Sequence, residues 1–135
     1  MEHIRVERDR IVFWVRISSS QWHRTTPGIA RRALRQHPDL ARHACVNAVG
    51  KTFGDVMEDT PIPHLLEHVT IDILTQQAAD SHATHVGTSV WESEQEGLAR
   101  IQVSMQDDLE VLDAFNQAVD FVNQLLSSDE DADRA

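Results

Sequence analysis

The pattern of apolar and polar residues predicts four β-strands and three α-helices along the chain. In chain order they are strands at 4–6 and 11–17, helices from 27 to before 38 and from 61 to about 77, strands at 86–91 and 98–105, and a helix from 107 or 108 to about 126. The stretch 40–59 has no regular pattern and is expected to form a loop with short elements. This order predicts an α+β fold, a two-layer sandwich of a mostly antiparallel sheet with helices on one face.

Two threonine–proline pairs mark the starts of the first two helices. Thr26-Pro27 and Thr60-Pro61 each place a capping hydroxyl before a proline, whose fixed φ suits the first helical turn. Pro38 limits the first helix because proline disfavours helical backbone in the residue before it. Apolar residues at helical spacing predict the last helix. They are Val111, Leu112, Phe115, Ala118, Val119, Val122 and Leu126.

Length and charge favour one domain at 1–126, followed by an acidic tail at 127–135 that is expected to be disordered. The 135 residues are 41% hydrophobic, which is enough to bury a core without disulfide bonds. The formal net charge is −10, of which the tail contributes −3. This acidity argues against binding to nucleic acid or to an anionic membrane surface, and it would favour a cationic substrate.

Cys45 is the only cysteine, so the chain cannot form an internal disulfide bond, which fits a reducing compartment. No apolar run approaches the length of a membrane span, and the first residues lack the apolar core of a signal peptide. We therefore expect a cytoplasmic protein. The sequence leaves homo-oligomerisation open.

The candidate chemistry lies in the second predicted helix, in the sequence His64-x-x-Glu67-His68. Residues four apart share a face of a helix, so the two imidazoles can reach one ion at about 2.0–2.1 Å. Glu67 lies between them in angle and can act as a general base toward a metal-activated water. This is the residue order of the inverzincin motif. Zinc suits such a site, although iron, cobalt or nickel would bind it as well.

The helical angle places this motif opposite the main apolar stripe of its helix. The stripe consists of Ile62, Leu65, Leu66, Val69 and Ile73. Ile71 and Leu74 lie on the side of the motif, and a plain solvated face rarely carries such residues. The pattern therefore favours a half-buried cleft with metal ligands. The alternative is that His64 and His68 are ordinary surface histidines.

A catalytic zinc usually keeps three protein ligands and one open position, so a third ligand must come from elsewhere. Glu92 is the first choice because it ends a predicted strand. His85 and His82 come next, followed by Glu94 and Glu96 in a turn that is more often simply solvated.

Three further residues are candidates for the walls of the cleft. Cysteine is most often a buried structural residue, so we expect Cys45, two residues after His43, to be structural, although it could still line the cleft. Trp91 is expected in the core or in the cleft wall, because the acidic charge argues against a platform for stacking nucleic acid bases.

With these residues in place, the chain resembles the N-terminal domain of cyanophycin synthetases from about Thr26 to Leu126. The segments that carry the resemblance are TPGI at 26–29, Leu34, HPDLARHAC at 37–45, TPIPHLLEHV at 60–69 and VGTSVWE at 86–92. The His-x-x-Glu-His-Val core is its most specific part. Asp72 stands where the family pattern has glutamate, within Thr70-Ile71-Asp72 in place of Ala-Leu-Glu.

The resemblance implies a domain that binds a polymer of aspartate with arginine side groups. In some members the domain carries a metallopeptidase-like centre that cuts this polymer. By that implication His64 and His68 are metal ligands, Glu67 is the base and Glu92 completes the metal shell. The motif is also similar to those of pitrilysin-type two-layer metallohydrolases and of S-ribosylhomocysteine lyase.

We therefore expect a Zn²⁺-dependent metallohydrolase, peptidase- or amidase-like, that acts on a peptide or on an arginine-bearing, cyanophycin-like polymer. The alternative is a non-catalytic binding or accessory module that keeps the fold and holds a metal only as a structural clip. A lyase or isomerase that uses the same metal is a third and weaker hypothesis, because one motif can serve several reactions.

Overall fold

The structure is a computed structural model that describes residues 3–18, 22–45, 49–77, 85–104 and 107–134, with side chains up to residue 127. Its strands are β1 (His3–Val6), β2 (Arg10–Arg16), β3 (Gly87–Ser93) and β4 (Leu98–Ser104). Its helices are α1 (Pro27–Gln36), α2 (Ile62–Gln77) and α3 (Asp108–Arg134), with short 3₁₀ helices η2 (Pro38–Arg42) and η3 (Phe53–Asp55). The predicted α+β fold is confirmed.

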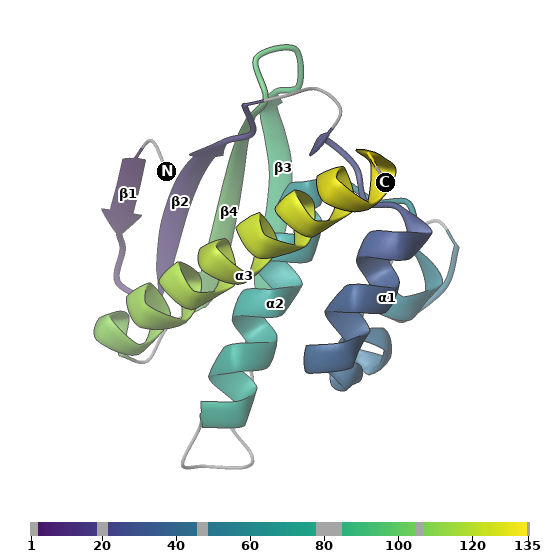
Figure 1. Ribbon diagram of the computed structural model, residues 1–135. Helices are drawn as coiled ribbons and strands as arrows, with labels where there is room; N and C mark the ends of the chain where they lie inside the picture. Colours follow the sequence, from purple (N-terminus) through teal and green to yellow (C-terminus); the bar gives the residue numbers. More distant parts are fainter. Residues whose placement is uncertain (1–2, 19–21, 46–48, 78–84, 105–106, 135) are drawn as a thin grey trace.

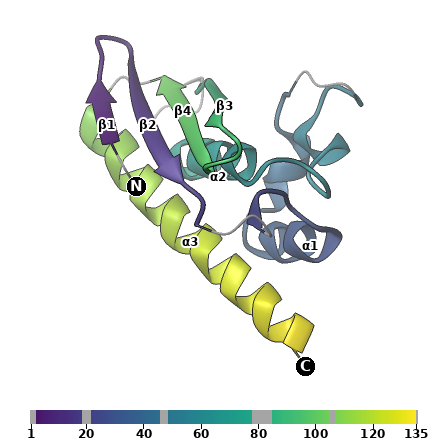
Figure 2. The same cartoon turned by 90° about the horizontal axis from the view of Figure 1, so that it is seen from above.

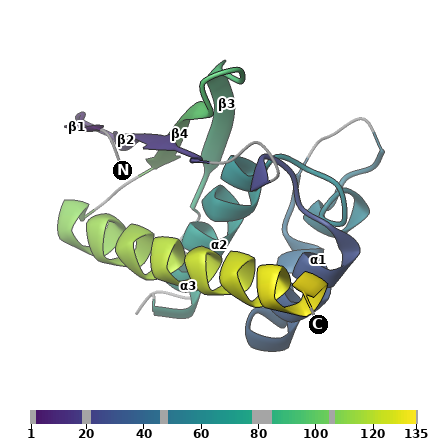
Figure 3. The ribbon, with the colours of Figure 1, turned by 45° about the horizontal axis from the view of Figure 1, so that its top comes forward.

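The four strands form one antiparallel sheet in the order β1-β2-β4-β3, so β3 is an edge strand. The helices α2 and α3 pack on the same face of this sheet, as Figures 1 and 2 show. Figure 3 shows β1 and β2 nearly edge-on above α3, with α1 beside the C-terminal part of α3. The two-layer arrangement with helices on one face is therefore as the sequence predicted.

The core lies between the inner face of the sheet and the apolar stripe of α3. Phe13 of β2 pairs with Ile101 of β4, and both side chains are fully buried. Phe115 of α3 stacks on Phe13, with ring centroids 3.7 Å apart. Each such aromatic ring removes a large apolar area from water, which makes this contact a main source of stability between the two layers.

The two threonine–proline pairs stand at the starts of α1 and α2. The Thr26 hydroxyl accepts a hydrogen bond from the Ile29 N–H and so caps α1. Thr60 lies just before α2, and its backbone N–H donates to the hydroxyl of Thr25. This contact ties the start of α2 to the segment that leads into α1.

The last helix differs from the prediction at its C-terminal end. Helix α3 continues to Arg134, whereas the sequence predicted a disordered tail from residue 127. No glycine or proline occurs between Asp108 and Arg134, so nothing in the local sequence stops the helix. Within the described part of the chain, no helix is long and apolar enough to cross a membrane.

The Phe13–Phe115 contact gives a direct test of the layer packing. Phe115→Ala should lower the free energy of unfolding by about 3–5 kcal/mol, because it leaves a cavity between α3 and the sheet. Leu109→Ala is a matched control on the same helix, since the Leu109 side chain is 72% exposed. It should change stability by less than about 0.5 kcal/mol. Urea unfolding of the three proteins measures both values, and equal losses would contradict this account of the core.

Candidate metal centre

A pocket of about 830 Å³ opens beside α2. Its walls are the side of α2 that carries the His64-x-x-Glu67-His68 motif, the segment that follows η2, and the first residues of β3. His64, Glu67 and His68 all line it, so the structure brings the complete sequence motif to one cavity. The same pocket is lined by Cys45 and His43 from the loop region.

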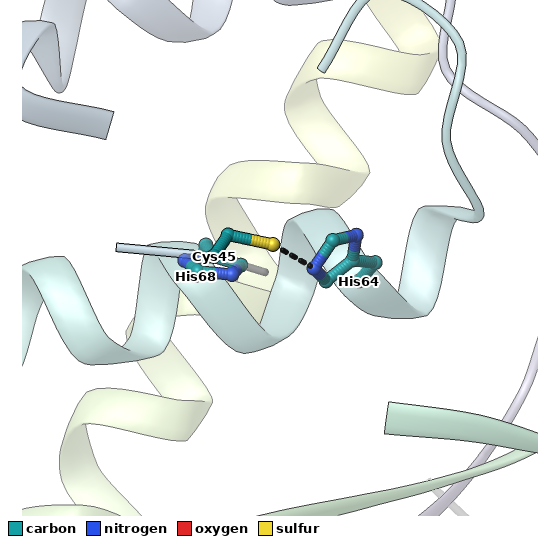
Figure 4. Close-up of side chains that lie close together, drawn as sticks. All are labelled: Cys45, His64 and His68. Carbon is teal, nitrogen blue, oxygen red and sulfur yellow. Dashed lines mark hydrogen bonds between the residues drawn. The ribbon is translucent and has the colours of Figure 1, made fainter. Parts of the chain in front are cut away.

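Three potential metal donors converge in this pocket. One ligand atom each from Cys45, His64 and His68 lies within 4.8 Å of the others. The Sγ of Cys45 is 3.4 Å from Nε2 of His64, and Figure 4 shows the thiol between the two imidazoles. Bond lengths of about 2.0–2.3 Å to a shared tetrahedral ion place its donors about 3.3–3.8 Å apart, which the Cys45–His64 separation matches.

The geometry of α2 and an aromatic ring position the two imidazoles. His64 and His68 are one helical turn apart, with ring centroids separated by 4.8 Å. Phe53 of η3 is fully buried. Its ring stacks on the His68 ring, with centroids 4.2 Å apart, and makes a T-shaped contact with the His64 ring, with centroids 4.9 Å apart. Phe53 therefore restricts the orientation of both rings.

The Nδ1 atom of each imidazole is engaged by the protein. The Thr60 hydroxyl lies 2.9 Å from Nδ1 of His64. Nδ1 of His43 lies 3.1 Å from Nδ1 of His68. In each ring this leaves Nε2 as the nitrogen that is available to a ligand in the pocket.

Burial keeps the two histidines neutral, as metal ligation requires. Burial, together with smaller contributions from the nearby His64 and His43 rings, lowers the pKa of His68 to about 3. Burial also lowers the pKa of His64. A thiol and two neutral imidazoles are soft and borderline donors that suit zinc and similar transition metals. The residues present therefore fit the metal that the sequence motif implies.

Glu67 lies in the same pocket with a side chain that is almost fully buried. Burial raises its pKa to about 7, while a hydrogen bond from Ser89 acts in the opposite direction. Its Oε2 is 3.7 Å from Nε2 of His68. A Cβ on Gly87 would stand 2.9 Å from the Glu67 Cγ, so glycine at this position lets β3 approach the carboxylate. Glu67 is thus held between α2 and the edge strand.

Asp72 forms a second polar group in the wall of the pocket. Its residue is 2% exposed, and its two oxygens contact three side chains. His37 and Gln76 lie 2.7 Å from Oδ2, and His43 lies 3.2 Å from Oδ1. Burial acts to raise the pKa of Asp72, but hydrogen bonds from His37 and His43 and the electrostatic interactions with these rings outweigh it and lower the pKa. Asp72 is therefore an ionised, buried carboxylate.

The description "cyanophycin synthase-like N-terminal domain" belongs to a family model that matches residues 10–127. This chain belongs to that family. The match confirms the family that the sequence resemblance named, across most of the chain. A comparison with curated proteins finds no match.

Cys45 lines the pocket, which the sequence had left open as an alternative to a structural role. Residues 43–45 follow η2, and Ala44 makes an isolated bridge to Thr52. Both side chains reach α2, His43 at His68 and Cys45 at His64. The contact between Cys45 and His64 was not predicted from the sequence.

Glu92, the predicted third ligand, lies apart from this group of donors. It is on β3 at a register irregularity and forms an ion pair with Arg100 at 3.0 Å. It is not among the residues that line the pocket. Glu94 and Glu96 are exposed in the turn that follows β3.

The remaining candidates of the domain divide between the pocket and its surroundings. His85 lines the pocket, and within the described residues its buried Nε2 has no hydrogen-bond partner. Trp91 packs against the ring of His23 at 5.0 Å and borders a smaller cavity with Pro61 and Pro63. His82 lies outside the described residues.

The side of α2 that carries the motif is more deeply buried than the half-buried cleft that the helical pattern predicted. Glu67 and His68 are each only 4% exposed. The apolar stripe of α2 meets the sheet and α3, but the opposite side meets η2 and Phe53 of η3 beside the pocket. Sequence periodicity shows which side of a helix is most apolar and says nothing of what covers the other side.

The raised pKa of Glu67 predicts how the stability of the metal-free domain depends on pH. Between the ordinary value of 4.5 and about 7, the folded state holds the Glu67 proton more tightly than the unfolded chain does. Stability therefore falls as the pH rises through this window. Glu67→Gln lacks the titrating group and should gain stability relative to wild type by roughly 3 kcal/mol across it.

Urea unfolding at a series of pH values, with a chelator present, measures this difference. Glu92→Gln is the control, because its carboxylate is partly exposed and paired with Arg100. A constant difference between wild type and Glu67→Gln would show that Glu67 keeps an ordinary pKa in the folded domain.

Proposed function

We propose that this domain is a zinc-dependent hydrolase of amide bonds, in which Cys45, His64 and His68 hold the metal and Glu67 is the general base. The observation that carries the proposal is the convergence of these three donors beside a buried carboxylate in an open pocket. A site that served only as a structural clip would need neither the carboxylate nor the open space.

Zinc with three protein ligands keeps one position for water, lowers the pKa of that water and polarises a carbonyl group. The chain's own residues supply the other functions. Glu67 can take a proton from a water in the pocket and return it to the leaving amine. A pKa near 7 suits both steps, because the carboxylate can be charged in one and protonated in the next. Phe53 shields the imidazoles on the side away from the pocket.

The edge strand β3 supports a peptide or another extended amide polymer as the substrate class. The Val86 carbonyl accepts a hydrogen bond from the Ser104 N–H at 2.8 Å. Antiparallel alternation then directs the backbone groups of Gly87 and Ser89 away from β4, toward the free edge. Both residues line the pocket. An extended chain could pair with this edge and bring an amide bond to Glu67.

Charge favours a basic substrate. The chain carries a net charge of −10, and an acidic protein concentrates cationic groups near its surface. Together with the family match, this supports an arginine-bearing polymer of the cyanophycin type as the first substrate to examine.

Metal content tests the proposed ligand set. After incubation with zinc and removal of the excess, elemental analysis should find about one zinc per wild-type chain. Cys45→Ala and His64→Ala should each lose the metal, because two remaining protein ligands hold zinc weakly. Glu92→Ala is the matched control and should keep it. Loss of zinc from Glu92→Ala with retention in Cys45→Ala would restore Glu92 as the third ligand.

Glu67→Gln tests the catalytic role separately from metal binding. The zinc content should match that of wild type, while cleavage should fall by about 10²–10⁴-fold because the general base is lost. Cleavage is measured as new amino groups released from a polymer of aspartate with arginine side groups, and from a mixture of arginine-rich peptides. Full zinc occupancy without cleavage by wild type would favour the binding-module alternative.

A further inference from the structure

A continuous line of hydrogen bonds runs from a buried carboxylate to one of the two histidines of the candidate metal centre. Oδ1 of Asp72 is 3.2 Å from Nε2 of His43. Nδ1 of His43 is 3.1 Å from Nδ1 of His68. The line thus joins two imidazoles that come from different parts of the chain, one from the end of η2 and one from α2.

For a neutral His43 ring, the donors and acceptors along this line follow one order. A carboxylate offers only acceptors, so Nε2 of His43 must donate to Asp72. A neutral imidazole carries one N–H, which leaves Nδ1 of His43 as an acceptor. Nδ1 of His68 must then donate to it. Nε2 of His68 therefore carries the lone pair, and it is the nitrogen that faces the pocket.

Asp72 is itself fixed by further contacts. Its Oδ2 accepts hydrogen bonds from Nδ1 of His37 and from Nε2 of Gln76, both at 2.7 Å. His37 ends α1 and Gln76 lies one turn further along α2. The carboxylate is thus held by residues from two helices, and its remaining oxygen is directed at His43.

We propose that Asp72 and His43 are positioning residues of the metal centre, which fix the tautomer and ring orientation of His68 so that its Nε2 can bind the ion. The inference rests on the proposed function for the metal itself. Metal-binding histidines commonly donate their second N–H to a carboxylate or carbonyl group. Here an additional imidazole stands between the carboxylate and the ligand.

The hydrogen-bond partner of His64 does not fix which nitrogen of that ring carries the proton. The Thr60 hydroxyl near Nδ1 of His64 can donate or accept, so it is compatible with either tautomer of that ring. Only His68 is linked to an ionised group through a chain with one polarity. Loss of the chain should therefore affect His68 more than His64.

Two substitutions at one position test the inference. His43→Asn keeps an oxygen acceptor close to the place of Nδ1, whereas His43→Leu has a similar size and no acceptor. Zinc affinity, measured by competition with a chromophoric chelator, should fall about 10–100-fold in His43→Leu and stay within about threefold of wild type in His43→Asn. Asp72→Leu should weaken zinc in the same direction. His3→Leu, on the distant edge strand β1, is the control and should leave the affinity unchanged.

A second measurement does not depend on the metal or on the stability of a variant. Nitrogen-15 NMR of histidine-labelled, metal-free wild type should show His68 with its proton on Nδ1. Wild type that binds zinc, with unchanged affinity in His43→Leu, would overturn the inference and leave the proposed function intact. A proton on Nε2 of His68 would overturn it whatever the zinc result, and a wild type without zinc affinity would overturn both.

Discussion

Burial of the polar side of α2 governs the chemistry of the site. One side of this helix packs on β3, β4 and α3, and the other meets η2 and Phe53 of η3 beside the pocket. Charged groups are costly in such surroundings unless they are neutralised or well hydrogen-bonded. Three buried polar residues of α2 avoid this free-energy penalty in different ways. His68 stays neutral, Glu67 holds its proton to a higher pH, and Asp72 remains charged with three hydrogen-bond partners.

The sequence predicted what local geometry determines. Strand and helix order follows from periodicity, and the two threonine–proline pairs mark helix starts because capping and proline geometry act within a few residues. The spacing of His64, Glu67 and His68 predicts a shared direction because they lie on one helix. Each of these inferences needs only the residues within one or two turns.

The sequence did not predict the contacts that depend on irregular backbone. Cys45 and Phe53 come from the stretch without a regular pattern, where neither alternation nor helical spacing predicts where a side chain points. Glu92 shows the opposite case, since strand alternation was informative there. Ser89 contacts Glu67 on α2, and Glu92 has the opposite parity on β3, so regular alternation turns it away from that helix. The alternating positions of Ser89 and Glu92 along β3 could therefore have argued against Glu92 as a metal ligand.

Charge balance connects the burial of the pocket to the donors that it contains. Without a metal, two neutral imidazoles and a Glu67 carboxyl of raised pKa add little charge to the part of the pocket where the donors meet. A divalent ion adds two positive charges, and a thiolate ligand with an ionised Glu67 would cancel them. A second carboxylate among the ligands would leave excess negative charge in a buried space. The donor set of Cys45, His64 and His68 beside Glu67 is therefore matched to a divalent ion, with Asp72 kept apart by His43 as the hydrogen-bond anchor of the site.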